Sequence, residues 1–438
     1  MVVMSKKSKA INESRKQIKS QSFIENHRRS DKCFTRKRSL PFSVLMVLIM
    51  RKSVKSLQNV VNEATGWLGL PPVTDSAYSQ ARYKLKHSAF IELNQTAIVE
   101  TVYSDDDYHK FWGFRVLAID GSKIVLPNTK NVREEFGTIA YSNGKDSEII
   151  GEHPYALASV LYDVLNRVAI DAHLGKARAY EIDLAVEHLA HTQAKDLLTM
   201  DRNYPSYRML AELTQNQREY VIRCSAASFS VARKMLKGEG SDSQTVTLKP
   251  CAEQMPIIRK LGLSTSLKVR FVRVKLSTGE NEVLVTSLYN EASYPTVDFA
   301  ELYYLRWGIE TFYGLLKTRL ELENFTGIQA EAVRQDFHAS VYLTGLESIL
   351  TDTAQKQLDS KKTKYPQTVN RSVSFNAIKN NAFDLLFGDD ETDLIEEKLT
   401  ALFLTNPTVD RKHRNPPRKK SSARRLLNFH KRQKKHCF

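Results

Sequence analysis

The segment of the chain that decides the fold reads YYLRWGIETFYGLLK, from Tyr303 to Lys317. Its apolar residues recur at helical spacing, so we predict a helix. One stripe of this helix is apolar and is expected to pack on a core: Leu305, Ile309, Phe312 and Leu316. A separate face, within about 60° of arc, carries an acid, two bases and a phenol: Tyr303, Arg306, Glu310 and Lys317.

Taken alone, this face is more typical of a solvated helix with an Arg306–Glu310 pair worth about 0.2–0.5 kcal/mol. The spacing Tyr-x2-Arg-x3-Glu-x6-Lys, however, resembles the signature of transposases of the IS-four family of bacterial insertion sequences. The resemblance implies that Glu310 is the last member of a catalytic Asp-Asp-Glu triad. It also implies that Tyr303, Arg306 and Lys317 contact DNA at the transposon end.

Two upstream segments resemble the motifs of this family that carry the aspartates. VLAIDGS (residues 116–122) places Asp120 after a predicted strand, and LLTMDRNYP (residues 197–205) places Asp201 after another. Each is weak by itself, because Asp120-Gly121 is also typical of a hairpin turn and Asp201 of a strand end. In chain order with Glu310 they predict the catalytic and metal-binding set Asp120, Asp201 and Glu310.

The pattern of elements predicts an α/β fold. Residues 110–225 alternate strands and helices, with the strands 114–119 and 123–126 expected as a hairpin around Asp120-Gly121-Ser122. Residues 226–295 read as a β-rich insertion of antiparallel strands, and residues 296–358 as the helical second part that bears Glu310. The resemblance implies a ribonuclease-H-like mixed sheet for this core.

Helical regions are expected on both sides of the core. Residues 41–109 read as a helical, DNA-binding unit or as an ordinary helical cap, and residues 359–410 as C-terminal helices. A basic arm (residues 1–40) and a basic tail (residues 411–438) carry net charges of +9 and +12, which leaves −5 for the rest of the chain. Such ends suggest contact with a polyanion or, more simply, solubilising tails.

Three carboxylates suit hard divalent cations, which prefer oxygen ligands. We therefore expect two Mg²⁺ ions, with Mn²⁺ able to substitute, Asp120 bridging them and Asp201 and Glu310 each holding one. We expect Trp307 to be buried by packing. His188 and His191 do not form an H-E-x-x-H motif and have no evident third ligand, so both are expected on the surface.

The predicted function is cut-and-paste DNA transposition by a metal-dependent endonuclease. Its partners are expected to be double-stranded DNA, as terminal inverted repeats and target, and a second copy of the chain in the DNA complex. Two alternatives stay open: a catalytically inactive repressor derived from a transposase, and another ribonuclease-H-like nuclease. The most apolar run, residues 40–50, is too short to span a bilayer, so no membrane partner is expected. The four scattered cysteines fit a reducing cytosol, and the resemblance implies the cytoplasm of a bacterium, at the nucleoid.

Overall fold

The computed structural model describes residues 4–35, 40–52, 55–142, 149–276, 278–388 and 392–409. The chain divides into two compact units. The first comprises residues 1–106, 124–156 and 315–438, and the second comprises residues 107–123 and 157–314. The basic tail therefore lies outside the described residues. Among those that are described, no helix is both long and apolar enough to cross a membrane.

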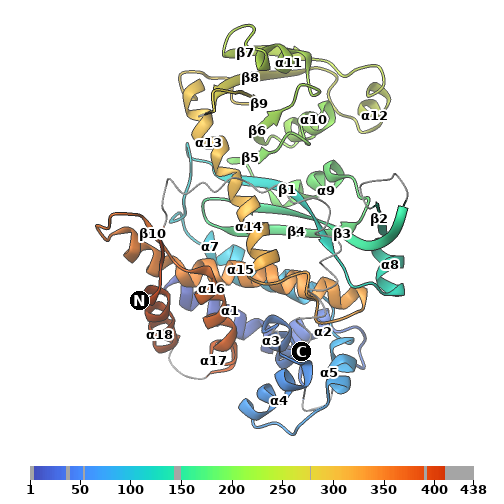
Figure 1. Cartoon of the computed structure of the whole chain (residues 1–438), viewed down its shortest axis with the longest axis vertical. Coiled ribbons are helices and arrows are strands. Elements are labelled where there is room, and N and C mark those ends of the chain that lie inside the picture. Colours follow the sequence, from blue (N-terminus) through green and yellow to red (C-terminus); the bar gives the residue numbers. More distant parts are fainter. Residues whose placement is uncertain are drawn as a thin grey trace. The chain divides into compact units, whose positions relative to one another are not determined.

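The second unit is built on a mixed sheet, whose neighbouring strands run in the order β3-β1-β5-β6-β9-β8-β7, with β4 beside β3 (Figure 1). Strands β5 and β6 run parallel to β1, whereas β9, β8 and β7 are antiparallel additions after β6. The strands are β1 (Arg115–Val125), β3 (Ile149–Asp163), β4 (Val168–Lys176), β5 (Asp196–Met200), β6 (Glu219–Cys224), β7 (Ser243–Leu248), β8 (Leu267–Lys275) and β9 (Asn281–Thr286). The β4-β3-β1-β5-β6 part is the expected ribonuclease-H-like core.

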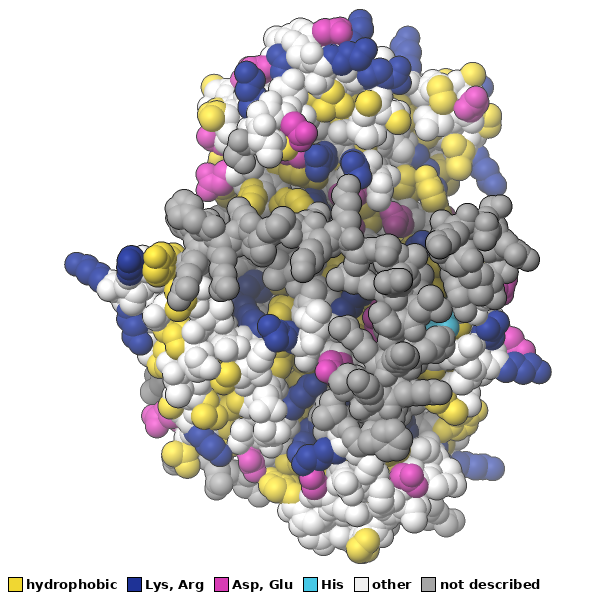
Figure 2. Space-filling model, viewed as in Figure 1, with side chains coloured by type: hydrophobic (Ala, Val, Ile, Leu, Met, Phe, Trp, Pro, Cys, Tyr) yellow, Lys and Arg dark blue, Asp and Glu magenta, His cyan; other side chains and the backbone are white. Residues whose placement is uncertain are grey.

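Helices lie between these strands along the chain, as in an α/β fold, or follow the last of them. They are α9 (Glu181–Glu187), the 3₁₀ helix η2 (His188–His191), α10 (Tyr207–Gln215), α11 (Ser230–Leu236), α12 (Met255–Lys260) and, after the last strand, the 3₁₀ helix η3 (Thr296–Asp298), α13 (Phe299–Leu305) and α14 (Trp307–Thr318). On the face in Figure 2, Lys and Arg side chains gather over the region of α11 and β7. Arg233 and Lys234 of α11 and its C-cap Lys237 are exposed.

One expectation about this unit was wrong, and another is extended by the structure. Asp120-Gly121-Ser122 is not a hairpin, because β1 continues through it as one strand from Arg115 to Val125. The β-rich insertion does form antiparallel strands, but these strands extend the main sheet through the pairing of β6 with β9. They bury a core that includes Val272 and Leu284 against Phe299, Leu302 and Tyr303 of α13.

The first unit is largely helical and is organised around the long helix α15 (Ala330–Asp359), which packs against α1, α3, α6 and α18. Its other helices are α1 (Lys6–Lys19), α2 (Gln21–His27), α3 (Phe42–Met50), α4 (Leu57–Trp67), α5 (Asp75–Arg82), α6 (Ser88–Leu93), the π-helix η1 (Asn94–Val99), α7 (Glu100–Val102), α8 (Lys130–Phe136), α16 (Arg371–Asn380), α17 (Ala382–Phe387) and α18 (Thr392–Thr405). Strand β2 (Thr138–Ser142) pairs antiparallel with the start of β3, and the short strands β10 (Gln367–Thr368) and β11 (Thr408–Val409) pair with each other.

The residues expected as an N-terminal basic arm form packed helices where they are described. Ala10, Ile11 and Ile18 of α1 are buried, as is Phe23 of α2. Arg15 donates hydrogen bonds to the main-chain carbonyls of Asp384 and Leu385 in α17. This stretch is therefore part of the helical unit and not a free arm.

Candidate active site

The two aspartates predicted from the sequence lie side by side on neighbouring parallel strands, Asp120 within β1 and Asp201 directly after β5. In the register of β1 and β5, Ile119 pairs with Met200, so Asp120 and Asp201 are the next residue on each strand. Neighbouring strands are about 4.8 Å apart, which brings the two carboxylates to one edge of the sheet. Each carboxylate accepts a 2.8 Å main-chain hydrogen bond through one oxygen, Asp120 from Gly121 and Asp201 from Asn203.

Glu310 reaches the same edge from α14. The pKa of Asp120 is raised to about 7, first by burial, then by the negative charge of Asp201, with a further contribution from Glu310. The Gly121 hydrogen bond and the Arg306 guanidinium act in the opposite direction. The charges of Asp201 and Glu310 act on Asp120 in this way because both carboxylates lie near it. The structure thus brings together Asp120, Asp201 and Glu310 from three separate parts of the sequence.

The Tyr303–Lys317 segment is not one continuous helix. Helix α13 ends at Leu305, Arg306 is its C-cap, and α14 begins at Trp307. The main-chain N–H of Arg306 bonds to Tyr303 and that of Ile309 bonds to Arg306, both at 3.1 Å and three residues apart. This tighter turn changes the rotation between the two halves of the segment, so a straight helical wheel does not describe its faces.

Tyr303 and Arg306 are buried, which differs from the expected exposed face. Tyr303 is 2% exposed, and its hydroxyl donates a 3.3 Å hydrogen bond to the carbonyl of Met200, just before Asp201. Arg306 donates to a carboxylate oxygen of Glu310 at 2.7 Å, and only 4% of its side chain is exposed. In this structure, therefore, Tyr303 supports the end of β5 and Arg306 holds the Glu310 carboxylate.

The remaining residues of the segment differ in how far they are buried. Ile309, Phe312 and Leu316 are buried as expected. Trp307 is 42% exposed, so the expectation of a buried packing role was wrong. Lys317 is half-buried in the first unit, where burial lowers its pKa and the charge of Glu323 opposes that shift.

One carboxylate near the site was missed from the sequence. Glu181 begins α9, and a Cβ placed on Gly121 would lie 3.2 Å from its Oε1. Burial raises the pKa of Glu181, and the negative charge of Asp201 raises it further. The available signal in the sequence was a Glu at the first position of a helix that follows a strand. The helix dipole alone already favours Glu at that position, so the signal does not single out a site residue.

The donor set fits hard divalent ions. Three carboxylates, with Glu181 as a fourth nearby, offer only oxygen ligands, which Mg²⁺ and Mn²⁺ prefer. The two aspartates come from the rigid ends of paired strands, which suits a site that must hold its ligands in place. The residues that could hold the ions are therefore Asp120, Asp201 and Glu310.

This arrangement agrees with a family assignment. Residues 111–343, just over half of the chain, match the family model described as "Transposase DDE domain". The chain belongs to the DDE transposase family. The matched region contains Asp120, Asp201 and Glu310.

Two known proteins extend the comparison. The transposase InsG for insertion sequence element IS4 of Escherichia coli (strain K12) is 26% identical over 305 residues, which are 66% of this chain and 65% of InsG. The match thus spans just under two thirds of the length of that relative. The solved synaptic complex of piggyBac transposase with hairpin DNA is 10% identical, covers 95% of this chain and 88% of that chain, and superposes with a TM-score of 0.45.

Proposed function

We propose that this chain binds the ends of a transposable element, cuts the DNA there and joins the 3′-ends to target DNA. The single observation that carries the proposal is the parallel register of β1 and β5, which aligns Asp120 with Asp201 at one edge of the sheet. Electrostatic coupling of Asp120 to Glu310 completes the acidic set. Membership of the DDE transposase family supports the same reading.

Asp120, Asp201 and Glu310 would hold two Mg²⁺ ions, for which Mn²⁺ can substitute. Divalent ions bound there stabilise charge on the attacking and leaving oxygens of a phosphodiester and activate a water or a 3′-hydroxyl. The role of the protein is positional: β1 and β5 fix the aspartates, and the Arg306 guanidinium keeps the Glu310 carboxylate at the site.

We also propose that Tyr303, Arg306 and Lys317 act in DNA binding, with roles that take account of where the structure places each side chain. Arg306 donates to Glu310 in this structure and only 4% of its side chain is exposed, so an exchange toward a phosphate would require this side chain to become accessible. A guanidinium binds phosphate bidentately, which makes the exchange chemically reasonable once Glu310 serves as a metal ligand. The buried Tyr303 would act through the position of β5, and Lys317 would neutralise a backbone phosphate. Two copies of the chain would hold the two ends.

The test uses the full chain and DNA that carries both flanks of its coding gene. Wild type should nick this DNA in Mg²⁺, and Asp120→Ala should abolish nicking but retain binding in a mobility-shift assay. Asp183→Asn, which changes an exposed carboxylate on α9, is the matched control and should cleave normally. Full cleavage by Asp120→Ala would overturn the proposal.

Two other outcomes would identify the alternatives. Binding of the flanks without any cleavage by wild type would favour a repressor derived from a transposase. Cleavage of branched junctions without preference for the flanks would favour a different ribonuclease-H-like nuclease.

A further inference from the structure

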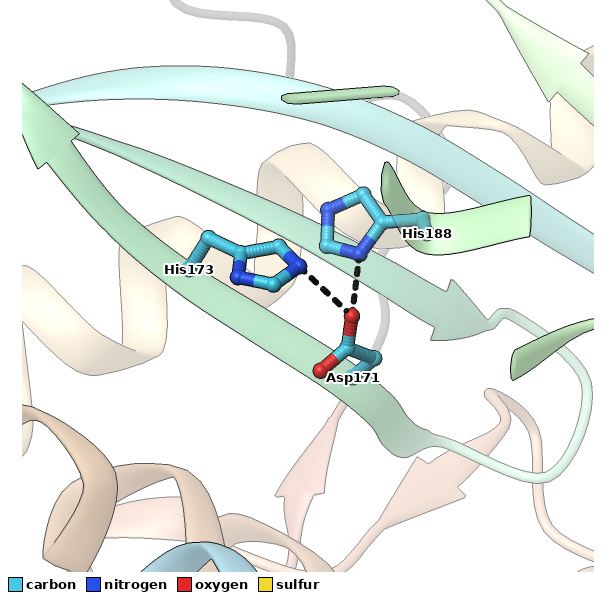
Figure 3. A group of neighbouring side chains, drawn as sticks. All are labelled: Asp171, His173 and His188. Carbon is cyan, nitrogen blue, oxygen red and sulfur yellow. Dashed lines mark hydrogen bonds and ion pairs between the residues drawn. The ribbon is translucent and has the colours of Figure 1, made fainter. Parts of the chain in front are cut away.

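A second cluster of metal-ligand side chains lies on β4 and η2 and shares no residue with the Asp-Asp-Glu set (Figure 3). Asp171 and His173 come from β4, and His188 is the first residue of η2. One ligand atom from each lies within 4.8 Å of the others. His188 is completely buried, so the expectation that it lies on the surface was wrong.

The imidazoles converge on a single carboxylate oxygen. His188 Nδ1 lies 2.7 Å from Asp171 Oδ2, and His173 Nε2 lies 2.9 Å from the same atom. The His173 contact is close but lacks hydrogen-bond direction, so this buried nitrogen has no hydrogen-bond partner among the described residues. The two ring nitrogens thus point at one carboxylate oxygen, and the nitrogen of His173 has no hydrogen bond among the described residues. A cation bound between these three atoms would be coordinated by all of them.

The outer nitrogen of His188 is also hydrogen-bonded. His188 Nε2 lies 3.0 Å from Oγ of the buried Ser159. Histidines that bind metals almost always use the second ring nitrogen in this way, because that partner fixes the tautomer and the ring orientation. His173 Nδ1 lies 3.9 Å from a carboxylate oxygen of Glu187, which is too long for a hydrogen bond, so of the two only His188 has an outer hydrogen-bond partner of this kind among the described residues.

A fourth ligand is available from η2 itself. His191 Nε2 lies 3.7 Å from Asp171 Oδ2. In a 3₁₀ helix, side chains three residues apart eclipse each other, so His188 and His191 project from the same face of η2. Ligand atoms around tetrahedral Zn²⁺ lie about 3.4 Å apart when the bonds are about 2.1 Å long. His191 lies outside the group of three whose ligand atoms are all within 4.8 Å of one another, so its side chain would have to move toward the other two histidines to complete a tetrahedral site.

We propose that Asp171, His173, His188 and His191 form a structural Zn²⁺ site. Three imidazoles and one carboxylate suit Zn²⁺, whereas Mg²⁺ and Ca²⁺ prefer oxygen ligands alone. Four protein ligands leave no open position, so the ion would stabilise the fold and would not take part in chemistry. It would fasten η2 to β4, and η2 directly follows α9, whose first residue is Glu181.

The test measures zinc binding by the full chain. Metal is removed with a chelator, zinc is added, free zinc is removed by desalting, and the bound zinc is measured by elemental analysis. Wild type should retain one more equivalent of zinc than Asp171→Asn or His188→Gln, and zinc should raise its unfolding temperature. His109→Gln, an exposed histidine of the same unit, is the matched control and should behave as wild type. Replacing the buried His188 could prevent folding, so the half-exposed His191→Gln serves as a second variant. It should fold and bind zinc at least about tenfold more weakly, the size that outer-partner changes already produce.

Zinc bound at the carboxylates of the active site is distinguished by a further variant. Asp201→Asn should keep the extra equivalent and the stabilisation by zinc. Equal zinc content in wild type, Asp171→Asn and His191→Gln would overturn the proposal. So would loss of the extra equivalent in Asp201→Asn, because the zinc would then belong to the acidic site. Either outcome would leave the histidines as a hydrogen-bonded network around Asp171.

Discussion

Arg115 and Asp196 form a buried bidentate ion pair at the first residues of β1 and β5. Arg115 donates from Nε and from a terminal nitrogen to the two oxygens of Asp196, each at 2.7 Å. The two residues are direct partners in the register that, five residues later, aligns Asp120 with Asp201. A one-residue slip would turn one carboxylate to the opposite face of the sheet, so this ion pair specifies the geometry of the active site.

Breaking this pair should therefore cost both stability and activity. We expect Asp196→Ala to lower the free energy of unfolding by about 3–5 kcal/mol, because it leaves a guanidinium buried without its counter-charge. Urea denaturation measures the loss. The double variant Arg115→Met/Asp196→Leu should recover most of the stability, since it removes both charges together. Equal stability of Asp196→Ala and wild type would show that the pair does not fix the register.

The hydroxyl of Tyr313 supports the other strand end. It donates to the carbonyl of Asp120 at 2.9 Å and contacts the carbonyl of Ala158 at 3.2 Å. Tyr313→Phe should lower the free energy of unfolding by about 1–3 kcal/mol and raise the Mg²⁺ concentration needed for half-maximal cleavage. Tyr304→Phe, at a side chain 72% exposed, is the control and should change neither value. An unchanged Mg²⁺ requirement in Tyr313→Phe would mean that the hydroxyl does not position Asp120.

The role of the Glu181 carboxylate in metal binding can be tested separately from that of the rest of α9. Because its carboxylate lies close to Gly121 and interacts with Asp201, Glu181→Gln should alter metal binding at the acidic site. We expect a several-fold change in the Mn²⁺ dissociation constant, measured by calorimetry, with little change in stability. Asp183→Asn on the same helix should bind Mn²⁺ as wild type does. Identical Mn²⁺ affinity in Glu181→Gln and wild type would exclude Glu181 from the site.

The sequence pattern located the strands that carry the two aspartates, and it could not locate features that depend on packing. Asp120 and Asp201 follow short apolar runs, which single strands produce by themselves. The exposed face expected for Tyr303 failed because the strands β8 and β9 cover that side of α13, and a helical wheel holds no information on a partner 20 to 35 residues away. The partners of His188 escaped notice for the same reason, since Asp171 and His173 reach it only through the tertiary fold.

The raised pKa of Asp120 predicts how the stability of the metal-free protein depends on pH. The ordinary pKa is 3.8 and the folded value is about 7, so the folded state binds this proton more tightly than the unfolded chain does. Stability in a chelator should therefore fall as the pH rises from about 4 to about 7, and the contribution should level off above that range.

Asp120→Asn replaces the titrating carboxyl group with an amide that does not ionise, so this variant is compared with wild type. Its unfolding temperature in chelator should exceed that of wild type at pH 8 and approach it at pH 4. Mg²⁺ should stabilise wild type more at pH 8 than at pH 6, because a carboxylate must lose its proton to bind the ion. Differential scanning fluorimetry across this range measures both effects, with Asp183→Asn as the exposed control. Parallel pH profiles for wild type and Asp120→Asn would show that Asp120 does not hold a proton near neutral pH.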